Sequence, residues 1–141
     1  MGVAREEFLT TLKEFAKEML ATTNISPGDT GDTDAATTTG PFFLGAQPSL
    51  VDFVIAPWVV RSWVFDTFKE GGVGIPAVGE GGDDEVVWAR LRSWKDAVDS
   101  RASIRDTLSE REHYLPIYKR YADDTAMSEL AKASRAGREV P

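Results

Sequence analysis

The chain has 141 residues, of which 42% are hydrophobic, so one globular domain with a hydrophobic core is expected. Its formal net charge of −7 argues against a protein that binds nucleic acid by neutralising phosphates. Because there is no cysteine, disulfides, thiolate metal sites and cysteine nucleophiles are excluded. No signal peptide is visible, and the longest apolar run is much shorter than the ~20 residues that cross a bilayer, so we expect a cytoplasmic protein.

An amphipathic helix is predicted over about residues 4–22. Its apolar side chains recur at helical spacing along one face, at Phe8, Leu12, Phe15 and Met19. Residues 23–40 are rich in turn-forming and small polar types, which predicts an exposed, flexible loop. The aspartates of this loop lack the glycine placement and the closing glutamate of a calcium site, so no metal is expected there.

A second helix is predicted to begin at Ser49, because Ser49 and Asp52 form the pattern of a capping box. The Ser49 hydroxyl can accept an N–H one turn into the helix, and the Asp52 carboxylate can accept the N–H of Ser49. We therefore assign both residues a structural capping role. The helix is expected to reach Lys69 and, being apolar around most of its circumference, to be buried. Pro57 within it is expected to cause a kink.

Residues 71–82 are glycine-rich, and we interpret them as a flexible loop between helices. A phosphate-binding loop is disfavoured, because no strand precedes it and the acidic residues around it would repel phosphate. Asp83, Asp84 and Glu85 then open a third helix, since acids are favourable at the positive end of a helix. Its buried stripe is predicted to contain Val87, Leu91, Trp94 and Val98, with Trp88 alongside.

A short helical turn over residues 102–108 and a final helical segment over about 114–136 complete the prediction. The segment Asp123-Asp124-Thr125 is a point where the final helix can divide into two, and residues 137–141 are expected to fray. No alternating strand pattern occurs, so the predicted class is all-α, with four or five helices around a tryptophan-rich core. The single helical domain is expected to span residues 4–136.

Two stretches resemble a known family. Residues 41–61, which include Ser49-Leu50-Val51-Asp52, resemble the start of the buried central helix of glutathione transferases, most closely the omega-type branch and its fungal relatives. Residues 91–104 are similar to the family's Leu and Trp helix that ends in Arg-Pro-Ser-Val, with Ala102 where the proline usually stands. The resemblance covers about residues 41–121, and both stretches are folding features of the helical C-terminal domain.

The resemblance implies that this chain is the helical C-terminal domain of an enzyme that has two domains. In that family a thioredoxin-like N-terminal domain binds glutathione and supplies a catalytic Cys, Ser or Tyr. This chain has no strand pattern and no cysteine, so we expect that domain to be absent, no catalytic residue here and an inactive chain. No cofactor is expected in the chain itself, because glutathione would be the co-substrate of the complete enzyme. The expected partners are a hydrophobic electrophile or a disulfide substrate, with no nucleic acid and no membrane, and self-association is expected from the surface left uncovered.

The resemblance also implies four substrate-binding residues. Trp58 and Arg61 match a Pro-Trp-x-x-Arg segment that contributes to the electrophile pocket, and Tyr114 and Tyr121 match aromatic residues of the last helix. A purely structural alternative remains for each residue. In this alternative, Trp58 would be a core side chain and Arg61 would form an ion pair with a nearby acid. The tyrosines would pack with their hydroxyls at the surface. His113, which has no paired Ser or Cys motif, is expected to be solvated or to cap a helix.

Two other functions compete with an enzyme domain. The first is a stand-alone protein-interaction module of the same helical type, which would use an exposed apolar face. The second is a small helical carrier of apolar ligands that has no connection with glutathione.

Overall fold

The computed structural model describes residues 2–23 and 40–138, and in these ranges the chain is all-helical, as predicted. The elements in chain order are α1 (Gly2–Thr23), α2 (Leu50–Val59), α3 (Trp63–Phe68), η2 (Gly82–Asp84), α4 (Glu85–Ser100), α5 (Ala102–Arg105), α6 (Arg111–Ala122) and α7 (Glu129–Arg135). The described residues include no β-strand, and their one isolated bridge joins Phe42 to Gly45. In the same ranges, no helix has both the length and the apolar character that a membrane span requires.

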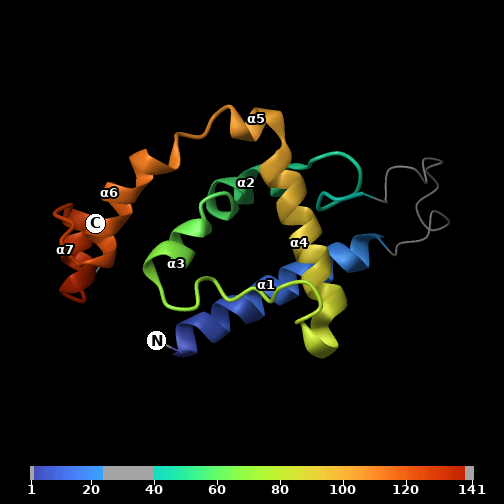
Figure 1. Cartoon of the computed structure of the whole chain (residues 1–141), viewed down its shortest axis with the longest axis horizontal. Helices are drawn as coiled ribbons and strands as arrows, with labels where there is room; N and C mark the ends of the chain where they lie inside the picture. The colour runs from blue at the N-terminus through green and yellow to red at the C-terminus, as the bar shows by residue number, and fades with distance from the viewer. Residues whose placement is uncertain (1, 24–39, 139–141) are drawn as a thin grey trace.

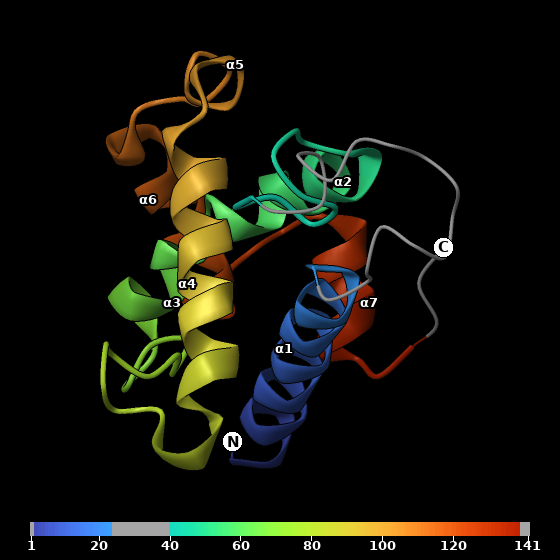
Figure 2. The same ribbon diagram turned by 90° about the vertical axis from the view of Figure 1, so that its right-hand side faces the viewer.

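The core forms where α1 and α2 pack against α4. Figure 1 shows α4 crossing α1, and Figure 2 shows the two helices side by side. The buried side chains that make this cluster are Ala16, Met19, Ala56, Val60, Trp88, Leu91, Trp94, Val98 and Ile104. Phe15 of α1 meets the edge of Trp94 at a ring-centre distance of 4.9 Å, which is a favourable aromatic geometry. The stripe predicted for α4 is therefore confirmed, with Val87 partly buried beside it.

The predicted continuous helix from Ser49 to Lys69 is wrong, because the chain divides it into α2 and α3. Pro57 has no N–H to donate to the carbonyl one turn back, and α2 ends two residues later. In the turn that follows, the backbone bonds tighten to i→i+3: Ser62 N–H donates to Val59 O and Val64 N–H to Arg61 O, both at 3.0 Å. Arg61 lies in this turn rather than within a helix.

The expectation that this helix is buried all round is also wrong. Asp52 and Ala56 are its buried residues, whereas Leu50, Val54 and Trp58 are 78%, 61% and 78% exposed. Because these three residues are spaced by four, they lie along one side of the helix, and we call them the α2 stripe. α2 therefore packs one face on α4 and presents an apolar face to the outside.

The C-terminal elements lie apart from the core and reach it through α3. Figure 1 shows α6 and α7 at the end of the molecule beyond α3, and α6 packs against α3. The division predicted as an option within the last helical segment occurs: α6 ends at Ala122, and Asp124 has φ +56° in the turn that follows. The new helix is capped by Ser128, whose hydroxyl accepts the Ala131 N–H at 3.2 Å, rather than by the 123–125 segment.

Of the predicted loops, residues 24–39 lie outside the described residues, as do residues 139–141 of the tail. The glycine-rich loop over 71–82 is held at several points. Glu85 accepts the N–H groups of Gly79 and Gly81 at 3.0 and 2.8 Å, and Arg92 donates both to Glu85 and to the Pro76 carbonyl. Arg5 of α1 donates to the Gly71 carbonyl.

Candidate functional site

Three hollows open around the turn between α2 and α3, and Arg61 lines all of them. We name them by their character. The apolar hollow has a volume of about 440 Å³, the charged hollow about 460 Å³ and the aromatic hollow about 260 Å³. The first two volumes are of the size found for small-molecule sites, and the third is close to it.

The apolar hollow lies between α2 and α5. Its lining is Phe53, Ala56, Pro57, Val60, Arg61, Ser103, Ile104, Thr107, Leu108 and Tyr114. Apolar side chains of α2 form one wall, and Ile104 with Leu108 forms the other. At one edge, Arg101 places its guanidinium over the Phe53 ring at 5.5 Å. The apolar side chains suit an apolar group of a ligand, and Arg61, Ser103, Thr107 and Tyr114 add polar atoms to the lining.

The charged hollow lies between the α2–α3 turn, α4 and the start of α6. Its lining is Val60, Arg61, Ser62, Trp63, Asp66, Lys95, Asp99, Leu108, Ser109, Arg111 and Tyr114. Lys95 and Asp99 form an ion pair across one turn of α4, and the second oxygen of Asp99 is buried without a partner in the described part of the chain. Asp66 accepts the Val73 N–H at 3.3 Å. This hollow is adjacent to the apolar one, because Val60, Arg61, Leu108 and Tyr114 line both.

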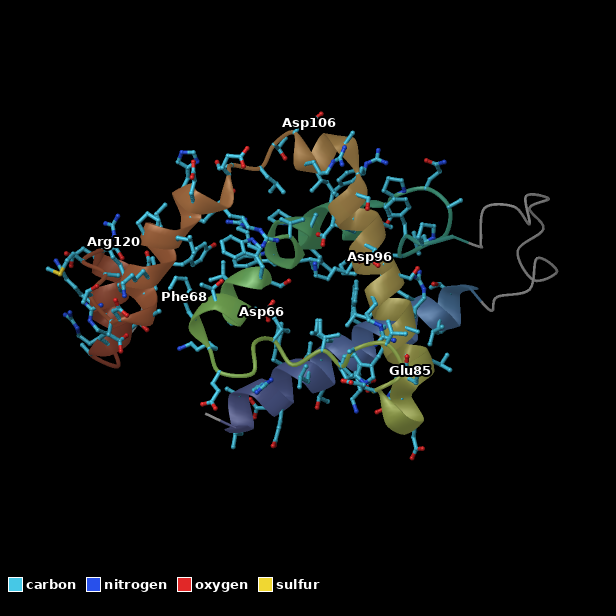
Figure 3. All side chains as sticks on the ribbon, in the orientation of Figure 1. Asp66, Phe68, Glu85, Asp96, Asp106 and Arg120 are labelled. Carbon is cyan, nitrogen blue, oxygen red and sulfur yellow. The ribbon has the colours of Figure 1, made fainter. Side chains whose placement is uncertain are left out.

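The aromatic hollow lies between α3 and α6. Its lining is Pro57, Trp58, Arg61, Val64, Phe65, Phe68, Lys69, Tyr118, Tyr121 and Ala122. Figure 3 shows Phe68 on the side of α3 that faces α6, whereas Asp66 points toward the loop that follows α3. The five aromatic side chains give this hollow ring faces and edges suited to a flat apolar group.

Arg61 does not form the ion pair that was its structural alternative in the sequence analysis. Its Nε donates to the Pro57 carbonyl at 2.6 Å, and no carboxylate in the described ranges lies within ion-pair distance of it. The side chain is half-buried at the junction of the hollows. Pro57 thus has two effects. It ends α2, and its carbonyl accepts a hydrogen bond from the Arg61 guanidinium, which lies at the junction of the hollows.

The structure places Trp58 and Tyr121 together in the aromatic hollow. Trp58 is 78% exposed, so the core alternative for this residue is wrong. Tyr121 on α6 is 51% exposed. The two side chains come from helices far apart in the sequence, and they are brought to one hollow because α6 packs against α3.

Tyr114 lines the apolar and charged hollows at the start of α6. Its hydroxyl accepts the Ser109 N–H at 3.3 Å, and its ring meets the edge of Trp63 at 6.4 Å. The other three residues implied by the resemblance, Trp58, Tyr114 and Tyr121, therefore each border a hollow that Arg61 also borders. His113 is exposed and lines none of the three.

Sequence reasoning did not find Trp63 and Arg111. The Arg111 guanidinium lies over the Trp63 ring at 4.9 Å, a cation–π distance, and both residues line the charged hollow. No short motif joins them, because one begins α3 and the other begins α6. The available signal was the pairing of an aromatic residue with an arginine at two helix starts, which many unrelated chains share.

The capping residues serve the site indirectly by fixing the start of α2. The capping box forms, and Asp52 is 1% exposed. Its carboxylate accepts the Ser49 N–H at 2.6 Å, the Ser49 hydroxyl at 2.7 Å, the Phe43 N–H at 2.9 Å and the Trp94 indole N–H at 2.7 Å. Burial by itself raises the pKa of this carboxyl, but these hydrogen bonds to the charged form outweigh burial and hold the pKa below its usual value.

The segment before α2 is bound to the same network. Arg90 of α4 donates to the Pro41 and Phe42 carbonyls at 2.9 and 2.7 Å, beside the Phe43 N–H that Asp52 accepts. Gly45 closes this segment with φ +133°, a conformation that favours glycine. Two residues of α4 therefore hold the start of α2: Arg90 binds the segment before the helix, and Trp94 binds Asp52 in its first turn. These contacts fix the direction of α2 and so the position of the turn that contains Arg61.

Residues 3–97 match the family described as Glutathione S-transferase, C-terminal domain. The chain belongs to this family. The match covers more than half of the chain and extends from α1 into α4. No curated protein and no solved structure matches the chain.

Within this glutathione transferase C-terminal domain, the matched residues differ in extent from the two stretches that carry the resemblance. The match includes α1, which precedes the region 41–121 that we delimited, and it ends before α5. Trp58 and Arg61 lie within the matched residues, whereas Tyr114 and Tyr121 lie beyond them. The two tyrosines are therefore connected with the site by their position beside the hollows and not by the family match.

Proposed function

We propose that this chain forms the second-substrate side of a glutathione transferase and holds a hydrophobic electrophile or disulfide substrate in the hollows around Arg61. The observation that carries the proposal is the convergence of three hollows on one unpaired arginine, in a chain of the glutathione transferase C-terminal domain family. Trp58 and Tyr121 would flank the substrate in the aromatic hollow, and Tyr114 would flank it in the apolar one.

Three finer points belong to the same proposal. The Pro57-Trp58-x-x-Arg61 segment favours the omega-like branch of the family, with thiol transfer as the reaction of the complete enzyme. The resemblance assigns glutathione binding and the nucleophile to a thioredoxin-like domain, so the chain by itself is proposed to be inactive. A cytoplasmic location agrees with that assignment.

The test uses the purified chain in two assays. With glutathione and 1-chloro-2,4-dinitrobenzene we expect no conjugation above the uncatalysed rate. Equilibrium dialysis against 1,3-dinitrobenzene, an unreactive aromatic analogue, should show saturable binding. Turnover by the pure chain would overturn the claim of inactivity, and absence of saturable binding would overturn the substrate-binding role.

Two variants locate the binding measured in that test. Tyr121→Ser removes a ring that lines the aromatic hollow, whereas Leu130→Ser removes an apolar side chain of α7 outside the three hollows. The two residues are matched in exposure, at 51% and 52%. We expect Tyr121→Ser to weaken binding by roughly tenfold, the scale of one lost aromatic contact, and Leu130→Ser to leave it unchanged. Equal effects would place the ligand elsewhere.

One observation favours a second candidate, a protein-interaction module. The α2 stripe of Leu50, Val54 and Trp58 presents a large apolar surface next to the aromatic hollow, and such surfaces mark protein contacts. Sedimentation velocity of the chain at micromolar concentration tests this candidate. Self-association of the chain that is lost in a Val54→Gln, Trp58→Gln double variant would support this candidate. A chain that sediments as a single monomeric species would count against it.

A further inference from the structure

The C-terminal arm, which we define as residues 111–138 with α6 and α7, differs in charge from the rest of the chain. It carries six basic and four acidic side chains, whereas residues 1–110 carry 10 basic and 18 acidic ones. Two lysines of the arm are neutralised by acids within it. Arg120, Arg135 and Arg138 form no ion pair with any carboxylate of the described residues. The arm is therefore a positive segment attached to an acidic protein.

The arm also has an apolar face that the described part of the chain leaves uncovered. Ile117, Tyr121 and Met127 are exposed, and α6 has no buried residue. These three side chains line a fourth hollow, of about 290 Å³, together with Arg120, Ala126 and Ser128. A helix of 12 residues that buries nothing is marginally stable in water, so the arm would gain stability from a surface that covers it.

A surface of the complementary kind lies on α1. Glu7, Glu14 and Glu18 share one face of this helix, because they are separated by about two and about three whole turns. Glu14 is paired with Lys17, whereas Glu7 and Glu18 have no basic partner in the part of the chain that the structure describes. Val3, one turn before Glu7, is 70% exposed. We call these four residues the α1 acidic face: Val3, Glu7, Glu14 and Glu18.

The arm and the α1 acidic face do not meet within one molecule. α1 packs on α4, and α6 packs on α3. Figure 1 shows the arm beyond α3, at the end of the molecule opposite α4. Within the described ranges, no ion pair joins the arm to α1. Two complementary surfaces that cannot meet in one chain can meet between two chains, and a two-fold axis then forms each contact twice.

We propose that two copies of this chain associate reciprocally, with the arm of each copy on the α1 acidic face of the other. Arg120 and Arg135 then face Glu7 and Glu18, and the hollow between α6 and α7 receives the Val3 side chain. Charge complementarity selects a second copy as the occupant, because the unpaired acids lie on the same chain as the unpaired arginines. The interface uses neither Arg61 nor the α2 stripe, so the inference is independent of the proposed function.

Sedimentation velocity of the purified chain at micromolar concentration provides the test. We expect a dimer in about 20 mM NaCl, with a dissociation constant roughly tenfold higher in about 500 mM NaCl, because salt screens the opposite charges. The net charge of −7 has the contrary effect, since salt weakens the repulsion between two acidic molecules. Weakening by salt therefore identifies attraction between opposite patches. A monomer at low salt, or a dimer that salt strengthens, would overturn the inference.

A charge exchange locates the contact. Arg120→Glu, Arg135→Glu reverses the arm, and Glu7→Arg, Glu18→Arg reverses the α1 acidic face. Each double variant alone should be monomeric at low salt, because like charges then meet in both contacts. An equimolar mixture of the two should dimerise again, because both contacts of the mixed pair join opposite charges. Recovery in the mixture also shows that both variants fold. A native chain that dimerises and a mixture that does not would contradict the assignment.

Two further variants exclude other causes. Lys69→Glu, Arg105→Glu changes the net charge as much as the arm variant, at exposed residues outside the arm and α1, and should keep the dimer. Loss of the dimer in this control, equal to that in the arm variant, would attribute the effect to net charge and overturn the inference. Val54→Gln, Trp58→Gln should also keep the dimer. Association lost in that variant but kept in the charge variants would place the contact on the α2 stripe instead.

Discussion

The Trp94 indole N–H donates to Asp52 Oδ1 at 2.7 Å and joins the middle of α4 to the first turn of α2. Both side chains are almost fully buried, at 1% exposure each. The same carboxylate completes the capping box and accepts the Phe43 N–H. One buried carboxylate thus sets the start of the helix that leads to the turn with Arg61, and several predictions about stability depend on it.

Asp52→Asn should lower the free energy of unfolding by about 2–4 kcal/mol, because an amide NH₂ would face the N–H of Ser49 and the charge that four donors stabilise would be lost. Asp96→Asn, on the exposed side of α4, is the control and should change it by less than about 0.5 kcal/mol. Urea unfolding followed by circular dichroism measures both. A loss for Asp52→Asn no larger than that of the control would show that the network contributes nothing net.

Trp94→Phe separates packing from hydrogen bonding when it is compared with Trp88→Phe. Both tryptophans belong to the buried stripe of α4, but within the described residues only Trp94 donates its indole N–H to a side chain. Trp94→Phe should therefore cost about 1.5–3 kcal/mol more than Trp88→Phe. In a double-mutant cycle, Asp52→Asn and Trp94→Phe should be less damaging together than the sum of the two. Additive losses would refute the coupling.

The lowered pKa of Asp52 predicts an acid-dependent loss of stability. A carboxyl whose pKa is lower in the folded state stabilises the fold above its unfolded value of about 3.9, and this contribution disappears as the pH falls through the folded pKa. The difference in unfolding free energy between the native chain and Asp52→Asn should therefore be constant near neutral pH and shrink below about pH 4. Asp84 and Glu85, whose pKa values are also lowered, titrate in both proteins and cancel. Parallel pH curves would contradict the assignment.

The glycine-rich loop gives a prediction about local dynamics. Glu85 accepts the N–H groups of Gly79 and Gly81, so Glu85→Gln should increase hydrogen exchange at these two amides, measured by NMR. Glu80→Gln, in the same loop and exposed, is the matched control and should leave both rates unchanged. If the two amides already exchange at unprotected rates in the native chain, the loop is as flexible as the sequence suggested.

Features that depend on neighbouring residues in the sequence were predictable. The capping box at Ser49 and Asp52, the buried stripe of α4 and the helical class follow from spacing and composition, and the structure has all three. These patterns work because a helix repeats every 3.6 residues, so one buried face leaves a periodic record in the sequence.

Features that depend on distant partners were not predictable. Apolar residues all round α2 predicted burial, but nothing in the described part of the chain covers Val54 or Trp58. The partner of Arg61 is the Pro57 carbonyl, and a backbone acceptor leaves no acidic residue to find in the sequence. The contact of Arg111 with Trp63 likewise exists only because α6 folds back against α3.

The central claim is that a small apolar ligand binds in the hollows around Arg61, and the four tryptophans test it most directly. Trp58 and Trp63 line the hollows, whereas Trp88 and Trp94 lie in the core. In ¹H–¹⁵N spectra of the chain titrated with 1,3-dinitrobenzene, the account predicts saturable shifts of the Trp58 and Trp63 indole signals, with those of Trp88 and Trp94 unchanged. Shifts confined to Trp88 and Trp94, or no shift at any of the four, would contradict it.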